Sequence, residues 1–218
     1  MNNILWIVLA VIIIILLLVL LMRPFKVAPQ LSTVSDPITM AQSLLNDKKV
    51  TMTLANPSGE KIIARTMYSE GVSSKGFKFS TDERTESNKD LNNLPQAAIL
   101  FWDPETSTQL RAQGRIVKAS QTESIETFNR LSREEQLRIA TSDQSTELET
   151  PTEHEEKIRK LEMILEGKPI AKPSYWHTYY LQPERLHFWR QTSEMRTPMV
   201  INFTKDVSGN WKGQQVYS

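Results

Sequence analysis

The stretch AAILFWDPETSTQLRAQGRIV, from Ala97 to Val117, decides the kind of fold that the chain adopts. Ala97 to Trp102 contains Ile99, Phe101 and Trp102, and Gln109 to Val117 ends in Ile116-Val117, residue types that favour extended backbone on a partly buried sheet. Asp103-Pro104-Glu105 lies between these two runs and is typical of a turn. The stretch therefore predicts two strands separated by a turn.

The chain on either side of this stretch repeats the pattern of short strands. Further strands are expected at Val50–Leu54, Ile62–Tyr68, Gly76–Thr81, Tyr179–Leu181, Arg185–Trp189, Val200–Thr204 and Trp211–Val216. Helices are expected after Ser35-Asp36-Pro37, at Lys89–Leu94, at Ser124–Leu131, from Ser132 onward and from Thr152 to Gly167. Many short strands with a few helices between them predict an α+β fold, a partly open β-barrel with peripheral helices.

Local chemistry supports the helix starts and the core. Ser132 with Glu135, and Thr152 with Glu155, have the spacing of a capping box. Asp36 followed by Pro37 is typical of a first helical turn. Four aromatic residues in the strand patterns are expected to pack the barrel or a dimer face: Trp102, Phe188, Trp189 and Trp211.

Four segments, in order along the chain, match one family. Phe79-Ser80-Thr81-Asp82-Glu83-Arg84-Thr85 is similar to its F-x-T-D-x-R-S motif, and Gln109-Leu110-Arg111-Ala112-Gln113-Gly114 is similar to its Q-x-R-x-x-G motif. Ser142-Asp143-Gln144-Ser145 is similar to S-x-Q-S, and Tyr175 to Trp189 resembles W-G-G-Y-R-L-x-P-E-R-I-E-F-W. From about Asp36 to its end, the chain resembles the pyridoxamine 5′-phosphate oxidase-like flavin split barrels.

The resemblance implies an FMN-binding split barrel in which flavin mononucleotide (FMN) sits at the interface of a homodimer. The cofactor-binding positions that it carries over to this chain are Arg65, Thr81, Arg84, Thr85, Gln109, Gln144, Ser145 and Trp189. Each of these residues, taken singly, is as compatible with an ordinary strand-end or turn residue of a barrel. No catalytic residue and no metal ligand is assigned.

The phosphate end of this expected site departs from the family in charge. The basic residue usually found five positions after the counterpart of Arg65 is Glu70 here, and the Arg-Lys pair after the Thr81 segment is Glu86-Ser87. Carboxylates beside a flavin phosphate would repel it and would be costly to desolvate. A local shift of register would bring Lys89 in as a replacement cation.

The substrate side departs as well. The R-L-H-D-R-like run of the oxidases corresponds to the stretch from Glu194 to Val200, where only Arg196 has a counterpart. The Gly-Gly of the last motif is His177-Thr178, which changes the backbone freedom at this point. His187 falls at an outward strand position and is expected at the surface.

The N-terminus carries an uninterrupted apolar run, Ile4 to Met22. At about 1.5 Å per helical residue the run covers roughly 28 Å, close to the hydrocarbon thickness of a bilayer. A cleaved signal would have a basic start and a small-residue cleavage site, and a buried core helix would have a polar stripe. Neither pattern is present, so a retained single-pass membrane anchor is favoured.

We therefore expect a transmembrane helix in residues 1–24, a linker in 25–34 and the split-barrel domain in 35–218. Arg23 and Lys26 follow the apolar run, which places the domain on the cytoplasmic or matrix-equivalent side. The absence of Cys agrees with a reducing compartment.

Composition excludes several functional classes. The 26 basic and 25 acidic residues give a net charge of +1, so nucleic acid is not favoured as a partner. No Gly-rich phosphate loop is present, and the three His residues have no zinc-site spacing.

Three functions remain open. The favoured one is a non-catalytic accessory or scaffold subunit of a larger membrane complex, with a degenerate flavin site. The alternative is an FMN-dependent oxidoreductase of unknown substrate, and the third is a binding module for another flavin, haem or a small anion. Fold alone does not choose between them.

Overall fold

The computed structural model of the chain describes residues 36–45, 50–142, 150, 152–193 and 195–217. The strands are β1 (Thr51–Ser58), β2 (Lys61–Tyr68), β3 (Val72–Ser73), β4 (Gly76–Asp82), β5 (Gln96–Asp103), β6 (Thr108–Lys118), β7 (Trp176–Arg190), β8 (Met199–Lys205) and β9 (Trp211–Val216). The helices are α2 (Pro37–Leu45), α3 (Gln121–Asn129), α4 (Arg133–Thr141) and α5 (Glu153–Leu165).

The expected anchor and linker lie outside the described residues. Among the helices that are described, none has both the length and the hydrophobicity needed to cross a bilayer.

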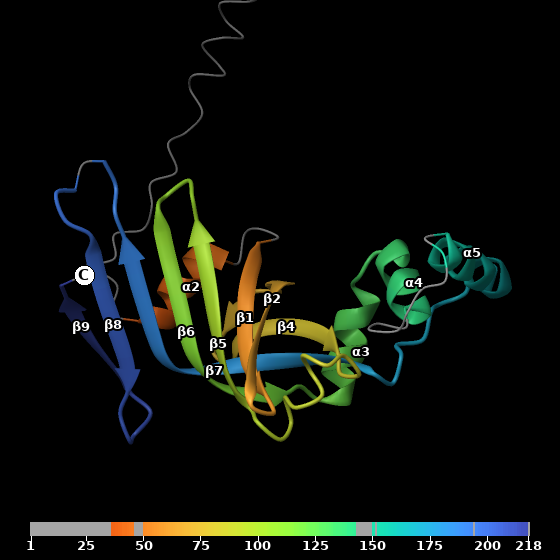
Figure 1. Cartoon of the computed structure of the whole chain (residues 1–218), viewed down its shortest axis with the longest axis horizontal. Helices are drawn as coiled ribbons and strands as arrows, with labels where there is room; N and C mark the ends of the chain where they lie inside the picture. Colours follow the sequence, from red (N-terminus) through yellow and green to blue (C-terminus); the bar gives the residue numbers. More distant parts are fainter. Residues whose placement is uncertain (1–35, 46–49, 143–149, 151, 194, 218) are drawn as a thin grey trace, which may run out of the picture.

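The strands form one antiparallel sheet that closes on itself as a split barrel. Its order is β2-β1-β5-β6-β7-β4-β3, with β8 added to β7 and β9 to β8. The barrel closes where Glu70 N–H donates to the Lys78 carbonyl and Lys78 N–H donates to the Gly71 carbonyl, both at 2.9 Å. Helices α3 to α5 extend from one side of the barrel and β8–β9 from the other (Figure 1). The expected α+β split barrel with peripheral helices is confirmed.

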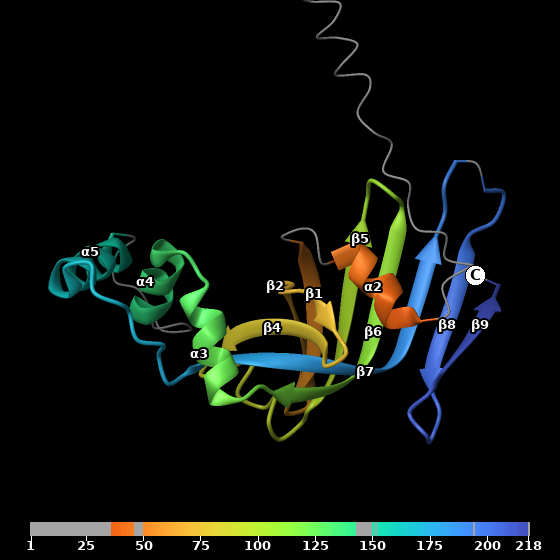
Figure 2. The ribbon, with the colours of Figure 1, turned by 180° about the vertical axis from the view of Figure 1, so that it is seen from behind.

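Two apolar clusters stabilise this arrangement. The barrel core centres on side chains with no exposed surface, among them Leu54, Phe79, Leu110, Tyr179 and Phe188. Helix α2 covers the barrel on the side seen in Figure 2 and buries its apolar face there. A smaller cluster around Phe128 and Trp176 lies under α3 to α5. The helical part therefore has a core of its own beside the barrel.

The stretch from Ala97 to Val117 forms β5 and β6, paired antiparallel, as its sequence predicts. The prediction of two separate strands at Tyr179–Leu181 and Arg185–Trp189 is wrong, because β7 is continuous through Pro183. Proline cannot donate to the ladder, and the register with β6 shifts here: Gln113 pairs with Arg185 and Gly114 pairs with Pro183, so Glu184 is an extra residue on β7. This bulge removes the conflict that the proline would otherwise create.

Two predicted helix features are wrong. Lys89–Leu94 is a series of turns, in which the Asp90 side chain bonds to the β1–β2 turn: its Oδ2 accepts from Ser58 Oγ and from Gly59 N–H, both at 3.1 Å. Thr152 makes no side-chain cap, since its backbone is already helical. The capping box of Ser132 and Glu135 is confirmed.

The four aromatic residues divide between core and surface. Phe188 is fully buried, and Trp211 packs partly buried against the core. Trp102 is 49% exposed and contacts Trp189, with ring centroids 6.1 Å apart. Trp102 and Trp189 therefore lie outside the barrel core, and their packing on a dimer face stays a prediction.

Candidate functional site

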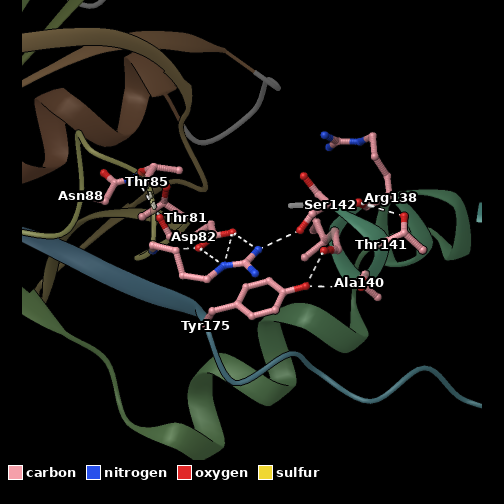
Figure 3. A network of polar contacts seen from close by, with 11 residues as sticks. Thr81, Asp82, Thr85, Asn88, Arg138, Ala140, Thr141, Ser142 and Tyr175 are labelled. Carbon is pink, nitrogen blue, oxygen red and sulfur yellow. Dashed lines mark hydrogen bonds and ion pairs between the residues drawn. The ribbon is translucent and has the colours of Figure 1, made fainter. Parts of the chain in front are cut away.

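Arg65, Thr81 and Thr85 meet at one end of the barrel, and Asn88 joins them. The Arg65 guanidinium donates to Asn56 Oδ1 and to Asn88 Oδ1. The Asn88 amide donates to Thr81 Oγ1 at 2.8 Å and also to Thr85 Oγ1. Figure 3 shows Asn88 beside these two threonines. Three of the residues expected to line the cofactor thus form one hydrogen-bonded cluster.

This cluster is buried and carries one cation. Asn56 is 1% exposed and Asn88 is 4% exposed. Burial lowers the pKa of Arg65 to about 10. Its Nε is buried and has no hydrogen-bond partner among the described residues. Two of the five N–H donors of Arg65, one on each terminal nitrogen, are therefore bound by neutral amide oxygens.

The family's basic position five residues after Arg65 holds a carboxylate that is paired within the protein. The Glu70 side chain is 25% exposed, and its Oε2 lies 3.5 Å from Lys78 Nζ. Burial raises the pKa of Glu70, and hydrogen bonding with Ser80 and the charge of Lys78 oppose that rise. Lys78 also donates to Thr127 Oγ1 at 2.7 Å. The Lys78 ammonium group is therefore already bound by Glu70 and Thr127.

The other two altered positions provide no cation. Glu86 is exposed, and the Ser87 carbonyl accepts a hydrogen bond from Asn56 Nδ2 at 3.1 Å. Lys89 is exposed in the turn that starts at Thr85, to whose carbonyl its N–H donates at 3.0 Å. The described structure contains no ion pair of Lys89 at this site.

Arg84 makes no hydrogen bond to Arg65, Thr81, Thr85 or Asn88, and it links the loop after β4 to the end of α4. Its guanidinium binds both Asp82 oxygens, with Nη2 to Oδ2 at 2.7 Å, and donates to the Ser142 carbonyl at 2.8 Å. It stacks on Tyr175, 3.4 Å from the ring centroid. The Asp82 carboxylate balances its charge. Gln144 and Ser145 lie outside the described residues.

Gln109 and Trp189 lie together, far from Arg65. Gln109 pairs with Trp102 on β5 and with Trp189 on β7. Thr81 pairs with His177 at the other end of the 15-residue β7. At about 3.3 Å per residue, a strand of this length covers tens of ångströms. Within one chain the expected cofactor residues therefore form two separate groups.

A second polar network lies beside Thr81 and was missed by the sequence reasoning. Glu83 accepts from Lys118 Nζ at 2.7 Å and from the Tyr179 hydroxyl at 3.3 Å, and its Oε1 lies 3.3 Å from His177 Nε2. Burial, and then the charge of Lys118, lower the pKa of His177. The replacement of a motif Gly by His177 was its one sequence signal. Asn56 and Asn88 had none.

A cleft of about 530 Å³ opens beside Thr81, between the end of β2, β4 and helices α3 and α4. Glu70 and Asp82 line it from the barrel, and Arg130 and Arg138 line it from the helices. The cleft thus combines both signs of charge.

Comparison with known proteins identifies the family. Residues 27–120 match the model of the pyridoxamine 5′-phosphate oxidase FMN-binding domain. A pyridoxine/pyridoxamine 5′-phosphate oxidase of Rubrobacter xylanophilus is 31% identical over 147 residues, which cover 67% of each chain. The chain belongs to the pyridoxamine 5′-phosphate oxidase family. The corresponding protein of Acaryochloris marina is 30% identical, over 70% of this chain and 71% of its own.

Solved structures agree with this fold. PhzG from Burkholderia lata, crystallised with tetrahydrophenazine-1-carboxylic acid, has a TM-score of 0.75 at 20% identity, covering 90% of this chain and 96% of its own. A pyridoxamine 5′-phosphate oxidase-related FMN-binding protein from Nostoc punctiforme has a TM-score of 0.66 at 15% identity, covering 88% and 100%. At these identities the likeness shows the fold.

The phosphate end of the site does not fit the cofactor of the pyridoxamine 5′-phosphate oxidase family. A flavin phosphate is a dianion, held best by several charge-assisted hydrogen bonds. Around Arg65 the described structure provides one cation bound by two amides, with carboxylates at 70 and 86. The residues at this end of the barrel therefore do not support a reaction step through a flavin.

Proposed function

We propose that this protein is a non-catalytic member of the pyridoxamine 5′-phosphate oxidase family. It has a degenerate flavin site and serves as an accessory or scaffold subunit of a membrane complex, held there by its N-terminal apolar run. One observation carries the proposal: each terminal nitrogen of the Arg65 guanidinium donates to an amide oxygen, that of Asn56 or that of Asn88. In this state its terminal nitrogens are already engaged where a phosphate would need them.

The size of the effect is large enough to abolish tight binding. Each charge-assisted hydrogen bond contributes about 1.5–3 kcal/mol. Glu70, Glu86 and Ser87 stand at three positions that are basic in the family, which removes several such bonds and adds repulsion from two carboxylates. A deficit of about 3 kcal/mol corresponds to more than a hundredfold loss of affinity.

The separation of the two residue groups supports a homodimer within this proposal. A single ligand in contact with both the Arg65 and the Trp189 group would need two chains, each contributing one group. Exposed apolar side chains on the outer sheet face, including Ile62, Tyr68, Leu100 and Trp102, give a second copy a surface to cover.

The alternative function is an FMN-dependent oxidoreductase. Two observations favour it. The unpaired Arg65 Nε remains available to an acceptor, and the relatives at 30% and 31% identity are named as oxidases. The substrate of such an enzyme is not indicated by the residues after β7.

A spectrum separates the two functions. Full-length protein, purified in mild detergent without added flavin, is expected to show no visible flavin absorbance, and denaturation should release no FMN into the filtrate. Stoichiometric FMN in the filtrate would favour the oxidoreductase instead.

A further inference from the structure

The cleft of about 530 Å³ has the barrel on one side and helices α3 and α4 on the other. An apolar contact joins the two sides where Phe128 on α3 packs edge-on against Trp176 at the start of β7, with ring centroids 5.4 Å apart. Two rings in contact hold the helices close to the barrel, but they can still turn against each other. Polar contacts on either side of the rings are therefore able to fix the width of the cleft.

A first polar link runs from Glu70 through Lys78 on β4 to Thr127 on α3. Lys78 Nζ lies 3.5 Å from Glu70 Oε2 and donates to Thr127 Oγ1 at 2.7 Å. The side chains of Lys78 and Glu70 are only 18% and 25% exposed, so water screens their charges weakly. The basic residue that the family usually has at position 70 would repel Lys78. The acidic residue of this chain holds Lys78 where it can bind α3.

Two further contacts attach the same face of α3 to the barrel. The Tyr180 hydroxyl donates to Glu123, which also pairs with Lys75 at 3.1 Å. One residue further along, Ser124 Oγ accepts from the Thr178 N–H at 3.2 Å. Hydrogen-bonding side chains thus meet β4 and β7 along a full turn of this helix.

A second polar link runs from Asp82 at the end of β4 through Arg84 to the Ser142 carbonyl at the end of α4. Arg84 Nη2 donates to Asp82 Oδ2 at 2.7 Å and to the Ser142 carbonyl at 2.8 Å. Arg84 also stacks on Tyr175, whose hydroxyl donates to the Ile139 carbonyl at 3.1 Å. Figure 3 shows the Asp82 side of this link at the barrel and the Ser142 side at α4. The link therefore spans from the barrel to the second helix.

The two links start from different points of β4. Lys78 and Asp82 are four residues apart on that strand, which separates their backbones by about 13 Å. Two contacts at such a separation, together with the aromatic contact, fix an angle as well as a distance. We propose that the two links are braces that hold α3 and α4 at a set distance from the barrel, so that the cleft keeps its width with no ligand in it. This inference goes beyond the proposed function, because it concerns how the cleft is held and not what it binds.

Hydrogen exchange followed by mass spectrometry tests the first brace, on full-length protein in mild detergent without flavin. In the wild type, the amides of α3 should exchange at least about a hundredfold more slowly than in an unstructured peptide. Glu70→Gln keeps the size of the side chain and removes its charge. It should speed exchange in α3 at least about tenfold and leave β5 and β6 unchanged.

Lys78→Met should have the same local effect, because it removes the other half of the ion pair. The double variant Glu70→Gln, Lys78→Met should then exchange like the single variants, since all three lack the same link. Glu126→Gln is the matched control, because Glu126 is exposed on the same helix. Circular dichroism checks folding, and either single variant decides the test if the other does not fold.

Arg84→Gln tests the second brace in the same way. Glutamine cannot bind both Asp82 oxygens and the Ser142 carbonyl together, so exchange in the last turn of α4 should rise at least about tenfold. The amides of β5 and β6 should again be unchanged.

Three results would overturn the proposal. The first is wild-type α3 that exchanges like an unstructured peptide. The second is folded Glu70→Gln and Lys78→Met variants that exchange like the wild type in α3. The third is exchange that rises equally in β5 and β6, which would mean that the ion pair stabilises the barrel as a whole. FMN released on denaturation would contradict the accessory function alone, and the exchange test would then use FMN-free protein.

Discussion

At the scale of single residues, Asn88 links the side chains that meet at one end of the barrel. Its amide nitrogen donates to Thr81, Thr85 and the Asp82 carbonyl, and its oxygen accepts from Arg65. The family pattern points to Arg65, Thr81 and Thr85 from the sequence, because their types recur at fixed spacing. Asn88 belongs to no such motif. Its role in binding Arg65, Thr81 and Thr85 could therefore be recognised only from the structure.

Asn88→Ala should destabilise the domain by about 2–4 kcal/mol, because it leaves buried donors and acceptors without partners. Asn92→Ala is the matched control: Asn92 is exposed in the same turn segment and should cost less than about 0.5 kcal/mol. Thermal unfolding followed by circular dichroism measures both. Equal effects of the two variants would show that the cluster contributes nothing to stability.

His177 should make stability depend on pH. Its folded pKa is lowered by burial and by Lys118, so as the pH falls below about 6.5 the unfolded chain binds a proton that the folded one resists. Stability is therefore retained above that pH and lost on acidification. The pKa of Glu83 is also lowered, so its contribution to stability is lost at a lower pH than that of His177. The pKa of His187 is lowered as well, so His187 adds to the loss of stability on acidification.

His177→Gln should reduce the loss of stability between about pH 7.5 and about pH 5.5. Unfolding midpoints at the two pH values give the comparison. A variant whose loss equals that of the wild type would remove His177 from this explanation.

At the scale of elements, sequence reasoning succeeded where local signals and tertiary contacts agree. The β5–β6 pair and the capped start of α4 follow from turn and capping chemistry alone. It failed at β7, which was predicted as two strands, Tyr179–Leu181 and Arg185–Trp189, but is one strand that includes Pro183. The bulge that accommodates this proline is at Glu184 on β7 itself, but it exists only against β6, a strand far away in sequence. Lys89–Leu94 failed for a similar reason, since contacts of Asp90 with Ser58 and Gly59 hold it in turns.

Gly114 should be essential to this crossing of β6 and β7. A Cβ at Gly114 would lie 2.0 Å from the Gln182 carbonyl oxygen, closer than any atom contact allows. Gly114→Ala should therefore lower stability by about 2–4 kcal/mol or prevent folding. Gln113→Ala, at the adjacent exposed position, should cost less than about 0.5 kcal/mol. Unfolding curves of the two variants test this, and a stable Gly114→Ala would contradict the close approach.

At the scale of the whole molecule, the barrel places the residues expected to bind the cofactor in two groups at opposite ends of β7. Sequence motifs could name members of both groups but could not show that one chain keeps them apart. Nor could motifs show that the cations left near the phosphate position are engaged by Asp82, Glu70 and two asparagines. These facts depend on how distant segments fold together.

The N-terminal run should decide where the molecule resides. Full-length protein is expected in the membrane fraction and should resist extraction by alkaline carbonate, whereas a chain without residues 1–24 should be soluble and folded, since the barrel has its own core. Fractionation followed by circular dichroism of the shortened chain provides the measurement. Carbonate-soluble full-length protein would contradict a spanning anchor.

The degenerate flavin site is the central claim, and a fluorescence titration of FMN at moderate salt tests it most directly. The wild type should show no saturation at micromolar protein. The triple variant Glu70→Lys, Glu86→Arg, Ser87→Lys changes the local charge by about five units and should bind tens- to hundreds-fold more tightly. A variant with Glu155→Lys and Glu156→Arg on α5 changes the charge by about four units away from this site and controls for most of the change in overall charge. Micromolar or tighter binding by the wild type, unimproved in the triple variant, would contradict the account.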